Sequence, residues 1–157
     1  MNPWKSISIA LVLALAASLP LSGSANLGEE ESSESKDPNW IEGKKAVEAK
    51  EWKRAADLLS KAAAAEPLNA DIQNWLGFAQ RKQGNLDAAF AAYNKALKLN
   101  PSHKAAHEYI GEAYLLTGDV TKAEQHVAEL QKLCSPIPCE QLKDLKRAVE
   151  EYKKSKK

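Results

Sequence analysis

Residues 70–101 read ADIQNWLGFAQRKQGNLDAAFAAYNKALKLNP, and this stretch decides the fold of the chain. It predicts two short antiparallel helices that are separated at Gly84-Asn85, because both residue types tolerate the left-handed backbone geometry of a tight turn. The second helix is expected to end near Asn100, since the proline that follows disfavours helical geometry in the residue before it. The stretch therefore predicts a helical hairpin with defined ends.

Gly77 lies in the middle of the first predicted helix, where glycine costs about 1 kcal/mol relative to alanine. A glycine at such a position indicates that another part of the chain approaches the backbone closely. Ala89 and Ala96 are small residues in the second helix, and we expect them to form the other side of this contact.

The same pattern occurs 34 residues earlier and 34 residues later. Gly43 and Gly111 hold the position of Gly77 in these two copies, and alanine, aliphatic or aromatic residues follow at similar spacings. A repeat of this length predicts a stack of similar supersecondary units. One departure is Lys50, which stands where the turn of the second copy has a glycine.

The small, aromatic, alanine and proline positions of these copies resemble the tetratricopeptide repeat family across residues 36–135. The resemblance implies an all-α solenoid of three helix-turn-helix repeats, which we place at residues 36–69, 70–103 and 104–135. In this family the first helix of each pair lines a concave face. The resemblance therefore implies a protein-protein interaction module, an adaptor or scaffold.

The first 25 residues have the pattern of a secretory signal peptide. Lys5 precedes an apolar run at residues 7–19, and Pro20 and a segment of small residues follow the run. The run has about 13 residues, fewer than the roughly 20 that a membrane-spanning helix needs. We therefore expect a cleaved signal peptide at residues 1–25 and an exported bacterial protein, periplasmic or secreted. An anchor that is not cleaved is the alternative.

The charges of the chain argue against a nucleic-acid partner. The sequence has 22 basic and 21 acidic residues, and removal of residues 1–25 takes away one lysine and leaves 21 of each sign. A nucleic-acid binder needs a basic face instead. The acidic, serine-rich linker at residues 26–35 and the basic tail at residues 153–157 are expected to be solvated. Contact of this tail with anionic lipid is the alternative.

A capping helix is expected after the repeats. It carries Leu142, Leu145, Val149 and Tyr152 on one stripe, which can cover the open apolar side of the last repeat. With the tail it occupies residues 136–157. The expected helices are 39–49, 52–65, 70–83, 86–99, 103–117, 120–133 and 140–154.

Cys134 and Cys139 are the two cysteines of the chain, and they flank Ser-Pro-Ile-Pro. In a secreted chain an even cysteine count at so short a distance predicts a disulfide. Closing this loop stabilises the fold by about 2 kcal/mol in the chain-entropy model. We therefore expect the disulfide to hold the capping helix in place.

The sequence contains no recognisable converging set of acid, base and nucleophile, so we predict that the protein is not an enzyme and needs no cofactor. His103 and His107 are four residues apart, which is the minimal spacing for two metal ligands on a helix. Zinc takes three or four ligands, so surface or inter-helix histidines are the favoured interpretation. A metal-binding or redox accessory protein is the alternative. His126 stands alone and is expected at the surface.

The first helix of each repeat is expected to direct apolar and aromatic residues toward the concave face, at about 100° per residue. An exposed apolar patch usually marks an interaction site, and aromatic residues beside charges suit a peptide or an amphipathic helix. We predict that an apolar or aromatic protein segment docks here, with charged residues setting its orientation. The predicted partner-binding residues are Trp40, Lys44, Asn74, Trp75, Phe78, Arg81, Glu108, Tyr109 and Glu112.

Two alternatives to this prediction remain at the sequence level. Ile41, Trp75 and Tyr109 lie at the edge of the predicted face, so they can instead be buried between neighbouring repeats. The face can also take a helix from a second copy of the chain, which would make the protein self-associating.

Overall fold

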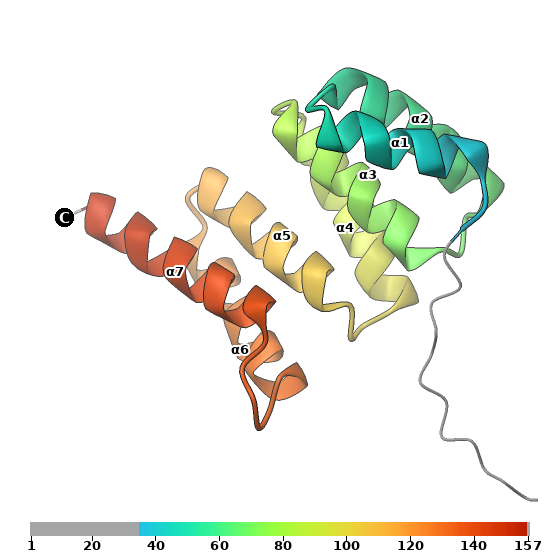
Figure 1. The fold of residues 1–157 in the computed structure, drawn as a ribbon. Helices are drawn as coiled ribbons and strands as arrows, with labels where there is room; N and C mark the ends of the chain where they lie inside the picture. The colour runs from blue at the N-terminus through green and yellow to red at the C-terminus, as the bar shows by residue number, and fades with distance from the viewer. Residues whose placement is uncertain (1–34, 157) are drawn as a thin grey trace, which may run out of the picture. The chain divides into compact units, whose positions relative to one another are not determined.

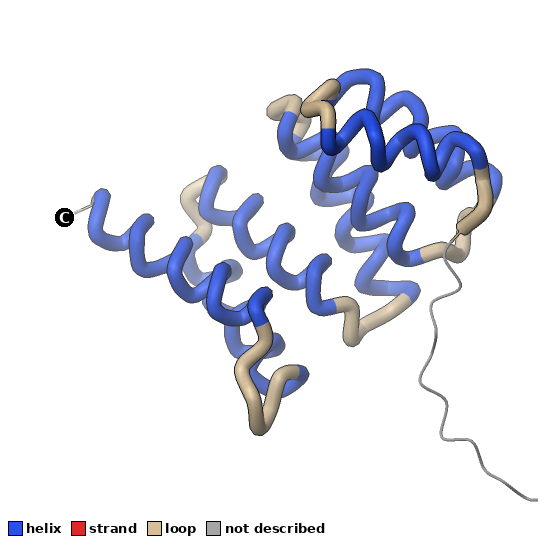
Figure 2. Tube along the Cα trace, in the orientation of Figure 1, coloured by secondary structure: helices blue, strands red, loops and turns tan. Residues whose placement is uncertain are grey.

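The computed structural model describes residues 35–156, and every regular element within this range is an α-helix (Figures 1 and 2). The all-α prediction is confirmed. The predicted signal peptide at residues 1–25 and residues 26–34 of the acidic linker lie outside the described residues, as does Lys157. The helices are α1 (Pro38–Glu48), α2 (Trp52–Ala65), α3 (Ala70–Lys82), α4 (Leu86–Leu99), α5 (Lys104–Leu116), α6 (Val120–Leu133) and α7 (Glu140–Ser155).

The helices pack as three antiparallel hairpins, α1–α2, α3–α4 and α5–α6. Each hairpin packs on the next because α2 contacts α3 and α4 contacts α5. The seventh helix, α7, packs against both α5 and α6 (Figure 1). No helix within residues 35–156 has both the length and the apolar character that crossing a membrane requires.

The helix ends follow from local side-chain chemistry. The Asp37 carboxylate accepts hydrogen bonds from the backbone N–H groups of Asn39 (2.8 Å) and Trp40 (3.1 Å), which satisfies two of the unpaired donors at the start of α1. Asn69 and Asp119 cap α3 and α6 in the same way. The observed helix bounds lie within one residue of the expected ones.

The close contacts at the mid-helix glycines differ from the prediction. A Cβ atom on Gly77 would lie 2.7 Å from two ring atoms of Tyr93 in α4, so Tyr93 forms the other side of this contact. Ala89 and Ala96 are fully buried in α4, but the three atoms nearest to such a Cβ all belong to Tyr93. An aromatic ring rather than a methyl group fills the space that the missing side chain leaves.

The three hairpin turns contain a residue with positive φ at 34-residue intervals: Lys50 (φ 59°), Gly84 (φ 85°) and Gly118 (φ 81°). The left-handed region suits glycine because a Cβ atom there is crowded by the backbone. Lys50 therefore holds a conformation that the sequence of the other two turns assigns to glycine.

We expect Lys50→Gly to raise the free energy of unfolding by about 0.5–1 kcal/mol. Relief of the left-handed strain contributes about 1–2 kcal/mol, and the greater freedom of glycine in the unfolded chain offsets part of it. Urea denaturation followed by circular dichroism measures the change. Gly84→Ala is the matched control and should destabilise; a Lys50→Gly variant that is less stable than the parent would contradict the expectation.

The capping role of α7 is visible in its packing. Leu142, Leu145 and Val149 are buried against α5 and α6, as the stripe predicts. A Cβ atom on Gly111 would lie 2.6 Å from Leu145, so the glycine of the third repeat receives α7 rather than its own partner helix. Cys134 and Cys139 form a disulfide, with Cα atoms 5.4 Å apart, immediately before α7 begins.

Candidate functional site

Four aromatic side chains from α1, α3 and α5 form a continuous series of ring contacts, which we call the aromatic row: Trp40, Trp75, Phe78 and Tyr109. The ring centroids of Trp40 and Trp75 are 6.3 Å apart, those of Trp75 and Phe78 are 5.9 Å apart, and those of Phe78 and Tyr109 are 5.0 Å apart. The tilted and edge-to-face angles are favourable for aromatic pairs at such separations. The structure thus brings together four of the predicted site residues from three helices.

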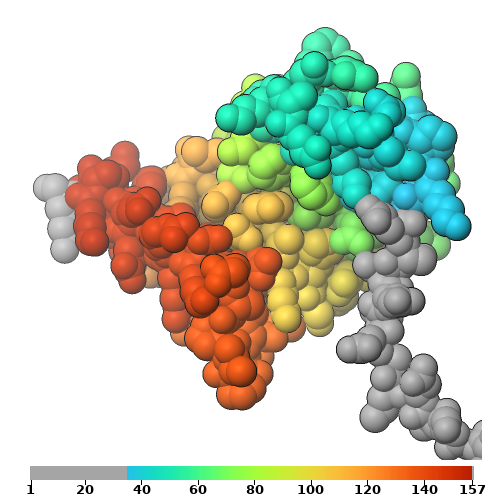
Figure 3. All heavy atoms as spheres, in the orientation of Figure 1, coloured from blue at the N-terminus to red at the C-terminus, as the bar shows by residue number. Residues whose placement is uncertain are grey.

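The aromatic row has an aromatic neighbour that is not among the predicted site residues. Trp52, in the first turn of α2, lies with its ring centroid 6.1 Å from that of Phe78. The periodicity of α2 alone does not indicate this contact, because it depends on how the α1–α2 turn is placed against α3. In the view of Figure 3, the green to gold atoms of α3, α4 and α5 lie between the teal atoms of α1–α2 and the red atoms of α7.

The members of the predicted face differ in exposure. Trp75, Phe78 and Tyr109 are partly buried and keep part of their surface accessible. Trp40 and Asn74 are only 4% and 2% exposed, so the prediction that they lie on an accessible surface is wrong. Trp40 lies in an apolar cluster with residues of α1, α2 and α3. Their burial makes them supports for the face, and the accessible aromatic surface is centred on Phe78.

Arg81 connects the aromatic row to its surroundings. Its Nη1 atom lies 2.7 Å from a Glu112 carboxylate oxygen, and its Nε–H donates to the Tyr93 hydroxyl at 3.3 Å. The guanidinium carbon also lies 5.4 Å and 5.6 Å from the ring centroids of Phe78 and Tyr109. Two of the four predicted charges, Arg81 and Glu112, therefore pair with each other, and Arg81 lies over the rings.

Two lysines flank the aromatic row. The ammonium nitrogen of Lys44 lies 5.1 Å from the ring centroid of Trp40, and that of Lys82 lies 5.2 Å from the ring centroid of Phe78. A cation over an aromatic face is attracted by the ring quadrupole. These contacts place positive charge along the α1–α3 part of the face.

Negative charge gathers at the other end, where α5 meets α7. Glu108 is half-buried and close to Glu112 and Asp144. Its pKa is raised to about 7, mainly by burial and to a lesser extent by the negative charges of these two residues. The Arg81 guanidinium opposes this shift. Burial also raises the pKa of the neighbouring Tyr109, with the Glu108 charge as the next cause.

His103 and His107 both contact residues of another helix, which agrees with the favoured interpretation as surface or inter-helix histidines. His103 caps α5 by accepting a hydrogen bond from the Ala106 N–H at 3.2 Å, and its Nε2 lies 3.0 Å from a carboxylate oxygen of Asp71. This contact with His103 lowers the pKa of Asp71. His107 is buried and contacts other groups, so the structure does not direct His103 and His107 toward a shared metal ion. Within residues 35–156, no group of three or more potential ligands is placed to hold a metal.

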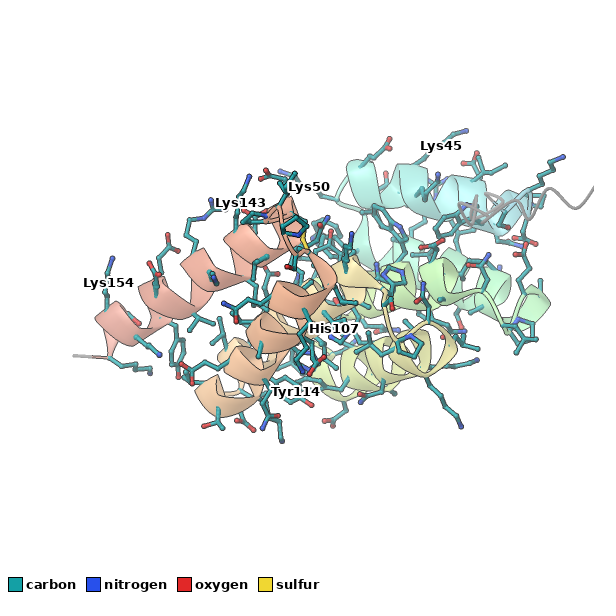
Figure 4. All side chains as sticks on the ribbon, turned by 90° about the horizontal axis from the view of Figure 1, so that it is seen from below. Lys45, Lys50, His107, Tyr114, Lys143 and Lys154 are labelled. Carbon is teal, nitrogen blue, oxygen red and sulfur yellow. A yellow bond between two sulfur atoms is a disulfide. The ribbon has the colours of Figure 1, made fainter. Side chains whose placement is uncertain are left out.

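His107 of α5, which is labelled in Figure 4, forms a hydrogen-bonded pair with His126 of α6. The Nε2 atom of His107 lies 2.9 Å from the carbonyl oxygen of Pro101, which can only accept, so this nitrogen carries the proton. The Nδ1 atom of His107 is then an acceptor, and Nδ1–H of His126 donates to it at 2.9 Å. His126 is half-buried and stacks on Tyr114, so its expected surface position is wrong.

The histidine pair makes stability depend on pH. The pKa of His126 is lowered from 6.5 to about 4. Burial is the main cause, and the electrostatic effect of His107 is the second. The unfolded chain then binds a proton at higher pH than the folded chain does, so this group's stabilisation is lost as the pH falls from about 6.5 to about 4. The raised pKa of Glu108 acts in the opposite direction, because stability from that group decreases as the pH rises from 4.5 to about 7.

We expect His126→Gln to remove the histidine contribution while keeping a donor for His107. Relative to this variant, the parent protein should lose stability steadily as the pH falls through the range in which free histidine becomes protonated. Urea denaturation at a series of pH values measures the difference, from which the Glu108 contribution cancels. Parallel stability curves for the two proteins would contradict the assigned histidine pair.

The sequence profile of the tetratricopeptide repeat matches residues 42–102 and again residues 79–136 of this chain. These matches span more than half of the sequence, and the repeated helical hairpins agree with them. The chain therefore belongs to the tetratricopeptide repeat family. Among proteins whose function is curated, none matches the sequence significantly.

Several solved structures share the fold. The type III secretion chaperone SycD of Yersinia enterocolitica, in complex with a peptide of the translocator YopD, has a TM-score of 0.67 and 16% identity, and the match covers 76% of this chain and 92% of that one. The Sgt2 tetratricopeptide domain of Aspergillus fumigatus has a TM-score of 0.68 and 21% identity, covering 82% and 84%. The first such domain of human RPAP3 has a TM-score of 0.61 and 21% identity, covering 73% and 92%.

Proposed function

We propose that this protein is an exported, non-catalytic adaptor that binds an apolar or aromatic segment of another protein across the aromatic row. The observation that carries the proposal is the contact series Trp75–Phe78–Tyr109, whose rings remain partly accessible. Rings that are already packed lose little conformational freedom when a partner binds, and desolvated aromatic residues dominate many interfaces.

The surroundings of Phe78 support a preformed binding surface. Arg81 lies over both Phe78 and Tyr109 and is itself held by Glu112 and Tyr93, so the rings have fixed neighbours before any partner arrives. A preorganised surface binds more tightly than one that must be ordered on binding. The peptide seated on the structurally similar chaperone SycD adds support by fold analogy.

We propose a periplasmic or secreted location on two grounds. Residues 1–25 have the pattern of a signal peptide, and the Cys134–Cys139 disulfide is typical of an oxidising compartment. The proposal includes no enzymatic step, since the family and the aromatic face both favour binding.

A random dodecapeptide library displayed on phage tests the proposed function on the full-length chain. We expect selection of peptides rich in aromatic and large aliphatic residues, and we expect Phe78→Ala to weaken the selected peptide by at least about tenfold, as loss of a central aromatic side chain does at many interfaces. Fluorescence anisotropy measures the affinity. Leu68→Ala is the matched control, because Leu68 is 81% exposed and lies outside the face.

Circular dichroism shows whether the Phe78→Ala variant is still folded, and so distinguishes a lost contact from a lost fold. A second variant, Phe78→Leu, keeps apolar volume at the same position. Unchanged affinity in a folded Phe78→Ala variant would contradict the proposal. Absence of any selected peptide, together with a mass that rises with protein concentration in light scattering, would favour self-association instead.

A further inference from the structure

The charges around the accessible end of the aromatic row come from three helices. They are Arg81 and Lys82 on α3, Glu108 and Glu112 on α5, and Asp144 and Arg147 on α7. Tyr109 of α5 is the further titratable group here.

Most of these charges already have a partner of opposite sign or an aromatic ring. Arg81 pairs with Glu112 at 2.7 Å, and Asp144 pairs with Arg147 at 2.5 Å. Lys82 lies over the ring of Phe78.

Glu108 is the exception. No basic side chain within residues 35–156 forms an ion pair with it, and its carboxyl group is half-buried beside Glu112 and Asp144. A carboxylate in such surroundings is stabilised most by a cation that enters from outside. The charge imbalance thus lies next to the aromatic surface that the proposed function uses.

We infer that the bound segment carries a lysine or arginine close to its apolar residues, and that this basic side chain pairs with the carboxylate of Glu108. The inference rests on the proposed function and specifies its ligand. An anionic group at the same place would be repelled by the Glu108 carboxylate, which has no basic partner within residues 35–156. Lysine and arginine side chains combine an aliphatic stem, which can lie along Tyr109 and Phe78, with a charged head that reaches the carboxylate.

The pairing couples binding to protonation. Because the pKa of free Glu108 is about 7, part of the protein carries a neutral Glu108 near neutral pH. A cationic side chain binds the ionised form, so binding releases a proton and the affinity should decrease as the pH falls from about 8 to about 6. Four further charges belong to the same region, where Arg81 pairs with Glu112 and Arg147 pairs with Asp144.

A comparison of two selections tests the inference. The full-length chain and its Glu108→Gln variant are each used to select from the random dodecapeptide library. We expect the parent to enrich lysine or arginine near the apolar residues and the variant to enrich the apolar residues alone. Glu150→Gln, an exposed acid on α7, is the matched control and should select as the parent does.

One selected peptide and its basic-residue→Gln derivative then complete a double-mutant cycle. The parent should bind the basic peptide about tenfold more tightly than the derivative, as expected for a charge-assisted contact, and Glu108→Gln should reduce this ratio to about one. For the parent, the ratio of the affinity for the basic peptide to the affinity for the derivative should also be smaller at about pH 6 than at about pH 8.

Three results would overturn the inference, and they differ in what they leave of the proposed function. Selection of apolar peptides without basic residues, or an equal loss on both proteins when the basic residue is replaced, would remove the Glu108 pairing and leave the proposed function intact. Failure to select any apolar peptide would remove both.

Discussion

Tyr93→Ala is expected to lower the free energy of unfolding by about 3–5 kcal/mol, the range for removal of a buried large aromatic side chain. Tyr93 is fully buried, and its ring fills the space beside Gly77 where a Cβ atom would lie 2.7 Å away. The ring centroid also lies 6.4 Å from that of Tyr109. Alanine leaves a cavity between α3 and α4 that their backbones cannot close fully.

The same substitution should weaken peptide binding, because the Tyr93 hydroxyl accepts a hydrogen bond from Arg81, which lies over Phe78 and Tyr109. Urea denaturation and fluorescence anisotropy measure the two effects. Tyr93→Phe is the matched control: it keeps the ring and loses one hydrogen bond, at a cost of about 0.5–1.5 kcal/mol. If Tyr93→Phe destabilised as strongly as Tyr93→Ala, the packing of the ring would not be the main contribution.

Leu145→Ala is expected to cost about 2–5 kcal/mol, the range for a buried leucine. Leu145 is fully buried and approaches the backbone of Gly111 so closely that no Cβ atom fits there. It therefore fixes α7 against α5. In a solenoid each unit contacts mainly its neighbours, so the loss should be largest in α7 and in the α5–α6 hairpin beneath it.

Hydrogen exchange separates the regions affected by Leu145→Ala. Amide protection should fall in α5, α6 and α7 and remain in the α1–α2 hairpin. Ile137→Ala is the matched control, since Ile137 is 80% exposed in the loop before α7 and its removal should change stability by less than about 0.5 kcal/mol. Equal loss of protection in all seven helices would contradict the description of α7 as a local cap.

The helices and their pairing were predictable because the signals for them are local. The break at Gly84-Asn85, the proline after Asn100 and the apolar stripe on α7 each act over a few residues, and the 34-residue period repeats the same information three times. Helix bounds within one residue of expectation follow from this redundancy. The family membership rests on the same periodic positions.

The details of the candidate site were harder to predict because they depend on contacts between repeats. Helical geometry places Trp40 and Asn74 on the inner face of their own helices, but both are buried, and Trp40 packs in a cluster that includes residues of α2 and α3. The pairing of Arg81 with Glu112 joins α3 to α5, and the pair of His107 and His126 joins α5 to α6. No spacing within a single helix indicates any of these contacts.

The charge distribution along the face became clear only from the structure. In the sequence, Lys44, Arg81, Glu108 and Glu112 are a mixed set of charges with similar expected roles. In the structure, Arg81 and Glu112 pair with each other, and Glu108 lies close to Asp144 of α7. The contribution from α7 could not be read from the repeats, because that helix follows a loop outside the 34-residue period.

The most direct test of the proposed binding face is nuclear magnetic resonance mapping of a selected peptide on the full-length chain. We predict that the largest amide shift changes occur around Trp75, Phe78 and Tyr109 on α3 and α5, with small changes on α4 and α6. Changes concentrated on α4 and α6, with the amides around Phe78 unmoved, would contradict the proposal that the aromatic row is the site of partner binding.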